Sequence, residues 1–130
     1  MKQIAQNWFR FSENDLRDAK ILFKNKSYEN SILLCHQSIE KYLKGVIALQ
    51  NREVRKTHDL PTLLKDTQLK FPKSLLNNAE ELTAYYQPSR YPDAHVTKSL
   101  LYNRANANKF LMSAKETIKW LNFHASKPNG

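Results

Sequence analysis

Hydrophobic positions recur along the chain at spacings of three and four residues, which is the period of an amphipathic α-helix. The most regular stretch covers about residues 28–49. Its apolar seam advances by alternating steps of four and three through Tyr28, Ile32, Cys35, Ile39, Tyr42, Val46 and Leu49, and it is widened by Leu43 and Ile47. A seam this regular predicts a central helix packed against two neighbours.

A second stripe predicts a first helix over about residues 3–25. Its apolar positions are Ile4, Trp8, Phe11, Ala19 and Leu22. Asp15 falls on the same stripe, and burying an unpaired carboxylate is costly. We therefore expect either a partner for Asp15 or a helix rotated so that this residue lies at the boundary. Ser27 is a plausible N-cap for the helix that follows.

Residues that commonly cap or break helices divide the rest of the chain into shorter helices. Residues 50–58 are polar and basic and are expected to form a loop. Asp59, followed by Leu60 and Pro61, indicates a capped helix near residues 60–69 with proline in its first turn. Pro72 and Ser74 indicate a further helix near residues 74–86.

The last helix is predicted after a segment with two prolines in five residues, which cannot be helix interior. Asp93 can cap this helix, which is expected over about residues 94–123. Its predicted core stripe is Val96, Leu100, Ala107, Leu111, Ala114, Ile118 and Leu121, with Lys98, Lys109 and Lys119 on the opposite face.

Composition agrees with one helical domain over residues 1–130. Apolar residues make up 41% and charged residues 25%, which is typical of a globular protein. Only two glycines occur, too few for a β protein rich in hairpins. The predicted fold is all-α, an antiparallel up-and-down bundle of four to five helices. No apolar run reaches transmembrane length and the N-terminus lacks a signal-peptide stretch, so a cytoplasmic protein without membrane contact is expected.

The residues that could bind metal do not form a metal site in the sequence. Cys35 is the only cysteine, which excludes an internal disulfide and a thiolate zinc cluster. The four histidines include no pair at metal-ligand spacing on one helix. We therefore expect no metal and no cofactor.

The formal charge of +9 favours polyanionic partners, with nucleic acid first and an acidic protein second. Glu40 and Lys44 form a favourable i, i+4 pair, and Lys41 lies beside them. Two interpretations stay open: a solvated helix face laced with salt bridges, or a site in which Lys41 or Lys44 reaches Asp15 or an anionic ligand.

Four segments in order resemble the HEPN domain of prokaryotic proteins: NDLRDAKILF at residues 14–23, YENSILLCHQSIEKYLKG at 28–45, THDL at 57–60 and SRYPDA at 89–94. The resemblance covers almost the whole chain. It implies a helical bundle that forms two-fold homodimers. Many members are encoded beside a minimal nucleotidyltransferase protein and behave with it as a toxin–antitoxin pair.

Other branches of this family are metal-independent ribonucleases that use an arginine and a histidine four to six residues apart. Arg90 and His95 have this spacing, just before the predicted last helix, and Arg52 and His58 have it in an earlier loop. The helix dipole would keep His95 neutral and competent as a base. Tyr91 and Pro92 depart from the ribonuclease pattern, and the RYP sequence looks instead like the nucleotidyltransferase-linked branch.

The sequence therefore predicts a HEPN-type dimeric module that binds RNA or a nucleotide through a basic groove beside a nucleotidyltransferase partner. The expected binding residues are Arg90, Tyr91, His58, Lys41 and Lys44. One alternative is an endoribonuclease in which Arg90 and His95 are catalytic, and another is a non-catalytic protein-interaction module. We also expect tyrosines near residues 85–91 to suit a dimer interface.

Overall fold

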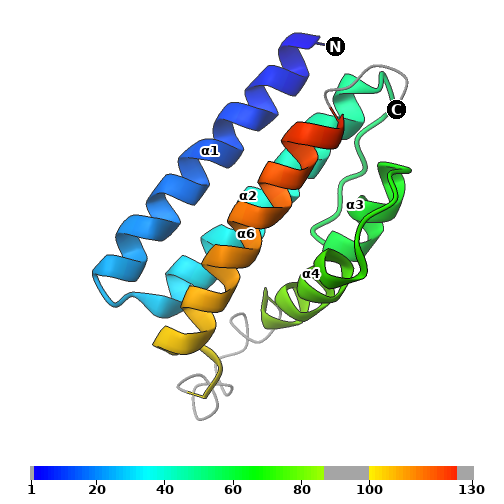
Figure 1. Ribbon diagram of the computed structural model, residues 1–130. Coiled ribbons are helices and arrows are strands. Elements are labelled where there is room, and N and C mark those ends of the chain that lie inside the picture. Colours follow the sequence, from blue (N-terminus) through cyan, green and yellow to red (C-terminus); the bar gives the residue numbers. More distant parts are fainter. Residues whose placement is uncertain (1, 87–99, 126–130) are drawn as a thin grey trace.

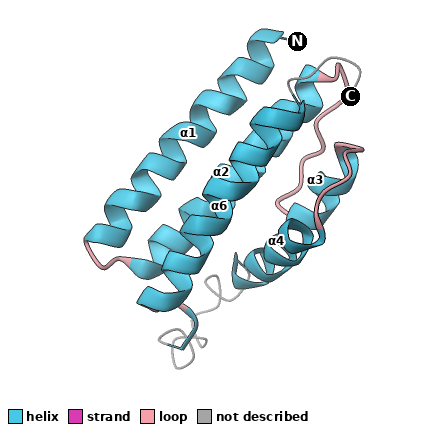
Figure 2. Ribbon diagram, viewed as in Figure 1, coloured by secondary structure: helices cyan, strands magenta, loops and turns pink. Residues whose placement is uncertain are grey.

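The computed structural model describes residues 2–86 and 100–125. Figure 2 shows this part of the chain as helices joined by loops, without a strand. Its five helices are α1 (Lys2–Lys24), α2 (Tyr28–Leu49), α3 (Leu60–Asp66), α4 (Lys73–Tyr86) and α6 (Arg104–Ala125). The predicted all-α fold with four to five helices is confirmed.

Helix α2 lies at the centre and contacts each of the other four helices. It forms an antiparallel hairpin with α1, and the short pair α3 and α4 covers the opposite side (Figure 1). After this pair, α6 runs alongside α2 in the same direction (Figure 1). Helix α2 therefore packs against every other helix of the described bundle.

The central position of α2 follows from its regular apolar seam, as predicted. Ile32, Cys35, Ile39 and Val46 are each at most 1% exposed. Leu43 and Ile47 extend the same buried surface toward the neighbouring helices. Only the end of the seam leaves the core, because Leu49 sits in the last turn and is exposed.

The face of α1 that packs on α2 is not the one predicted. Ala19 of the predicted stripe is fully buried as expected, but Ile4 and Phe11 are 49% and 48% exposed, and Ala5 and Ser12, which were not predicted, are fully buried instead. Small side chains at these positions let the two helices approach closely. Each of Ser12 and Ser38 then donates its hydroxyl hydrogen to the other's carbonyl oxygen, at 2.6 and 2.9 Å.

This rotation of α1 places Asp15 at the boundary of the core, where its carboxylate lies 2.6 Å from the ammonium of Lys41. Both outcomes expected for Asp15 are therefore present, a boundary position and a cationic partner. The ring of Phe9, which the sequence stripe did not include, lies against the backbone of α2 at Gly45. A Cβ atom at Gly45 would approach that ring to 2.5 Å.

The start of the third helix agrees with the sequence, whereas its end and the cap of α2 differ in detail. Asp59 accepts a hydrogen bond from the backbone N–H of Thr62 at 3.0 Å, and Pro61 occupies the first turn. The helix ends at Asp66 and not near residue 69, and Gln68 just beyond it takes a positive φ of 61°. Ser27 stands at the N-cap position of α2 without a side-chain cap bond.

The last helix was predicted to run from residue 94, but the described helix α6 begins at Arg104. The helix begins there because the side chain of Asn103 accepts a hydrogen bond from the backbone N–H of Asn106, at 2.9 Å. Leu100 was expected in the core and is 73% exposed. The rest of the stripe is confirmed by buried Ala107, Leu111, Ala114 and Leu121, whereas Val96 and the proposed cap Asp93 lie outside the described residues.

Candidate functional site

The most unusual polar group in the described bundle is the carboxylate of Glu40, which is nearly buried on α2. Its residue is 5% exposed, and one of its oxygens, Oε2, lies 2.9 Å from Lys44 Nζ. Lys44 is itself only 7% exposed and sits 5.5 Å from the ring centre of Trp8. A buried pair of this kind is costly to desolvate, so it depends on further hydrogen bonds around it.

His58 provides one of those bonds from the loop that precedes α3. Its Nδ1 lies 3.0 Å from Glu40 Oε2 and 3.2 Å from Oε1, while 60% of its side chain stays exposed. Since a carboxylate can only accept, Nδ1 donates its hydrogen. The neutral ring then carries an acceptor at Nε2. A carboxylate that fixes the orientation and tautomer of an exposed imidazole is the arrangement that prepares histidine for proton transfer.

A second histidine lies beneath the same carboxylate. His36 is fully buried one turn before Glu40, with its Nδ1 3.7 Å from Glu40 Oε1. Its Nε2 lies 3.2 Å from the hydroxyl of Thr83 on α4, which also accepts from the backbone N–H of Leu60 at 3.3 Å. Tyr86 stacks on the His36 ring at 4.3 Å. These contacts hold α4 and the start of α3 against the polar side of α2.

An open cleft of about 400 Å³ lies on the exposed side of His58. Its lining includes Lys56, Thr57, Asp59 and Tyr86. The cleft therefore presents one cation, one carboxylate, further hydrogen-bonding groups and an aromatic ring around the histidine. It is chemically suited to a polar ligand.

The basic loop beside this cleft is held in place by side-chain contacts. Arg55 forms a two-pronged contact with Asp66, at 3.0 and 3.1 Å, which ties the loop to the end of α3. Arg52 donates to Gln50 at 2.7 Å, and Gln50 donates to the carbonyl of Thr67 at 2.9 Å. The loop thus presents its cations from a fixed backbone.

The structure brings together two of the site residues expected from sequence. Lys44 and His58 share the carboxylate of Glu40, while Lys41 pairs separately with Asp15. Arg90, Tyr91 and His95 lie outside the described residues. Tyr85 and Tyr86, expected near an interface, pack within the chain, Tyr85 against Phe110 at 4.8 Å and Tyr86 against His36.

Of the two interpretations left open for this part of α2, the solvated salt-bridge face is wrong for Glu40 and Lys44, while Lys41 reaches Asp15 as the other interpretation expected. Glu40 and Lys44 are buried because α4 and the loop before α3 cover this side of α2, which a helical wheel of α2 alone cannot reveal. Sequence reasoning also missed His36 and Thr83. A readable signal existed, since His36, Glu40 and Lys44 recur at intervals of four and so share one face of the helix.

Two other kinds of function find no support in the described part of the chain. In residues 2–86 and 100–125, no group of three or more His, Cys, Asp or Glu side chains is arranged to hold a metal ion. No helix of this part is both long enough and apolar enough to span a membrane.

Two of three comparisons relate the chain to known proteins. A model of the HEPN domain matches residues 5–124. The crystal structure of TT1696 from Thermus thermophilus is similar with a TM-score of 0.84 and 28% identity, covering 95% of this chain and 98% of that one. The structure of ST0689, described as an archaeal HEPN homologue, gives 0.78 and 27%, covering 94% and 98%. No curated protein matches the sequence.

Proposed function

Because the chain belongs to the HEPN domain family, we propose that it acts as a homodimeric module that binds RNA or a nucleotide through a basic surface. In this proposal its partner is a minimal nucleotidyltransferase, and the two form a toxin–antitoxin-like pair. The observation that carries the binding function is the open cleft in which His58 is oriented by buried Glu40.

Charge supports a polyanionic ligand at this place. The chain has a net charge of +9, and Lys56 lines the cleft with His58 and Asp59. Lys56 also lines a neighbouring hollow that includes Arg52. Polyanions bind such surfaces by displacing counterions, so affinity should depend strongly on salt. Arg90 follows four residues after Tyr86 of the cleft, and in the proposal it supplies a two-pronged phosphate contact.

The residues expected from sequence take different parts in this proposal. Lys44 is buried against Glu40 and acts by holding the carboxylate that orients His58. Lys41 is paired with Asp15, so in the proposal it would contact a ligand only by exchanging this partner. Tyr91 would offer a ring on which a base can stack.

Exposed apolar residues on α1 support the dimer. Ile4 and Phe11 flank Trp8 at helical spacings of four and three, and both are about half exposed. Trp8 contacts Lys44, so this stripe lies beside the cluster formed by Glu40, Lys44 and His58. Apolar side chains grouped in this way are typical of interaction surfaces. A two-fold contact through them would place two clusters near each other.

A second candidate function is a metal-independent endoribonuclease, and the Glu40–His58 pair is the observation that favours it. An imidazole fixed by a carboxylate can take a proton from a 2′-hydroxyl or return it to a leaving group. Arg90 and His95 would be the catalytic residues that the family pattern implies, with arginine stabilising the phosphorane charge.

Binding and cleavage can be tested in one series in EDTA. A fluorescent single-stranded RNA is titrated with wild type, Arg90→Ala, His58→Ala and Lys119→Ala, the last an exposed lysine on α6 that serves as control. The proposal expects both of the first two variants to bind more weakly than wild type and the control to bind equally. Equal binding by all four proteins would contradict it.

The same samples, analysed on a denaturing gel beside an Arg90→Ala/His95→Ala double variant, report cleavage. Strand scission by wild type that is lost in the double variant supports the ribonuclease. Intact RNA with normal binding supports the non-catalytic module. Light scattering at micromolar concentration tests the dimer, and a monomer mass would contradict it.

A further inference from the structure

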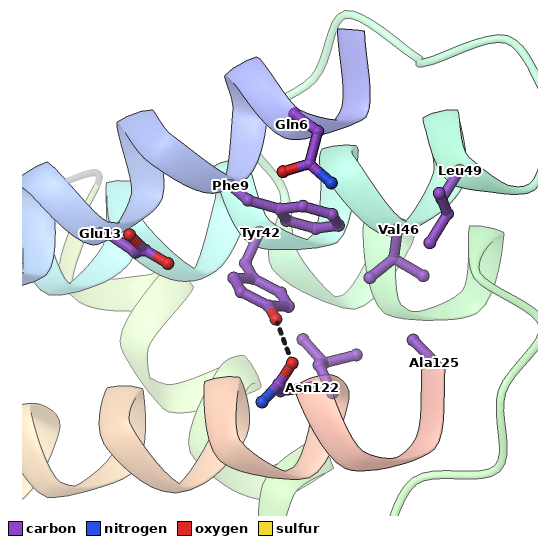
Figure 3. A pocket seen from close by; sticks show the side chains of 9 residues that line it. Gln6, Phe9, Glu13, Tyr42, Val46, Leu49, Asn122 and Ala125 are labelled. Carbon is purple, nitrogen blue, oxygen red and sulfur yellow. Dashed lines mark hydrogen bonds between the residues drawn. The ribbon is translucent and has the colours of Figure 1, made fainter. Parts of the chain in front are cut away.

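A second pocket, which shares no lining residue with the His58 cleft, lies between the first half of α1 and the last turns of α6 (Figure 3). Tyr42 and Val46 of α2 form its floor, Phe9 and Glu13 come from α1, and Asn122 comes from α6. Its volume is about 290 Å³, near the lower limit of small-molecule sites. The pocket therefore suits a compact organic molecule.

Aromatic and aliphatic side chains provide most of the inner surface. The rings of Phe9 and Tyr42 lie 4.7 Å apart, and Figure 3 shows them one above the other. Phe9 is held there because Gly45 lets its ring lie against the backbone of α2. These fixed rings offer a flat apolar ligand a ready surface at little entropic cost.

The charge of the pocket is opposite to that of the protein. In a chain with a net charge of +9, the described residues that line the pocket include no lysine or arginine, and Glu13 carries the one charged group among them. Glu13 forms no ion pair with any residue of the described part of the chain. Among these described residues a phosphate or carboxylate ligand would meet a carboxylate and no cation, so the pocket does not suit the anionic ligands proposed for the His58 cleft.

The hydroxyl group of Tyr42 stays protonated in this pocket. Burial raises the pKa of Tyr42, and the negative charge of Glu13 raises it further. The phenol therefore remains protonated at neutral pH and donates to Asn122 Oδ1 at 3.4 Å, as the dashed line in Figure 3 marks. This contact joins α2 to α6 across the bottom of the pocket and leaves Glu13 at its rim.

We propose that this pocket binds a small aromatic monoamine, with its ring against Phe9 and Tyr42 and its ammonium group beside Glu13. A carboxylate next to aromatic faces favours an organic cation through charge attraction and the cation–π interaction. A metal ion is a poorer match, because the described lining offers one carboxylate and no histidine or cysteine. The site is independent of RNA binding, so either proposal can fail without the other.

The experiment is an NMR titration of the ¹⁵N-labelled full chain with phenethylamine and with its neutral analogue 2-phenylethanol. For phenethylamine we expect shifts centred on residues 6–13, 42–46 and 121–125 and a dissociation constant on the order of 1 mM. The alcohol should bind about tenfold more weakly, because it keeps the ring and loses the charge. Equal affinity for the two probes, or shifts centred elsewhere, would overturn the proposal.

Two variants and one further probe complete the test. Glu13→Gln keeps the shape of an exposed side chain and should weaken phenethylamine about tenfold, whereas Glu116→Gln, an exposed carboxylate on α6 outside the pocket, should bind as wild type. Unchanged affinity in Glu13→Gln contradicts the assignment. Nα-acetyl-lysine N-methylamide should bind more weakly than phenethylamine. Tighter binding would assign the pocket to a lysine of a protein partner and overturn the small-molecule ligand.

Discussion

His58 Nδ1 lies 3.0 Å from Glu40 Oε2, so a half-exposed ring in a loop is fixed by a carboxylate that is buried on the central helix. The same oxygen accepts from Lys44, which makes the carboxylate a junction between the interior of the bundle and its surface. Such a junction is sensitive to the loss of any one partner, because the remaining charge is left buried.

The first prediction concerns this junction. Glu40→Gln should lower the free energy of unfolding by about 3 kcal/mol, because Lys44 would remain buried without an opposite charge. Urea denaturation at neutral pH measures the loss. The double variant Glu40→Leu/Lys44→Met removes both charges and should lose clearly less. A double variant that is less stable than Glu40→Gln would show that the pair itself stabilises the fold.

A second prediction compares two aliphatic residues. Ile39 is 1% exposed at the centre of α2, so Ile39→Ala should cost about 2–4 kcal/mol through lost burial and a residual cavity. Leu100 is 73% exposed, so Leu100→Ala should change stability by less than about 0.5 kcal/mol. Denaturant titrations of the two variants check both values. Similar losses would mean that the described packing of α2 is incorrect.

A third prediction concerns Cys35, whose pKa is raised from 9.0 to about 12 by burial, against a smaller opposing effect of Lys115. The folded pKa exceeds the unfolded one, so the stabilisation is complete below pH 9 and decreases as pH rises toward 12. At pH 10 the loss should be about 1.4 kcal/mol relative to pH 8.

Other groups also titrate in this range, so the measurement is the pH dependence of wild type minus that of Cys35→Ala, both from urea denaturation. Native protein at pH 8 should also react with iodoacetamide far more slowly than unfolded protein. Fast alkylation of the native chain would place the thiol at the surface and contradict the described core.

How far the sequence predicts this structure depends on how much of each environment is local. The seam of α2 was predicted almost residue by residue, because a helix that contacts all its neighbours needs apolar groups on most of its circumference. The cap at Asp59 was predicted because capping depends on adjacent residues. The orientation of α1 was not, because the small buried groups Ala5 and Ser12 are favoured by close approach to α2 and carry little hydrophobic signal.

The site was harder to predict because its parts come from separate elements. Glu40 and Lys44 were identified as a pair, yet their burial depends on α4 and on the loop that carries His58. His36 and Thr83 meet across 47 positions of sequence, a separation at which no local pattern operates. The start of α6 was missed for the opposite reason, since one short-range contact from Asn103 interrupts an otherwise continuous periodicity.

The central claim is that this basic module binds RNA or a nucleotide through a surface that includes Arg90 and His58. The most direct measurement is the affinity for a short single-stranded RNA as a function of salt concentration, for wild type, Arg90→Ala and the control Lys119→Ala. The claim predicts a linear fall of log affinity with log salt, and a slope smaller by about one phosphate contact in Arg90→Ala alone. Thermal melts confirm that each variant is folded at the temperature used. An Arg90→Ala protein that melts at a lower temperature, yet binds RNA with the affinity and salt slope of wild type, would contradict the claim.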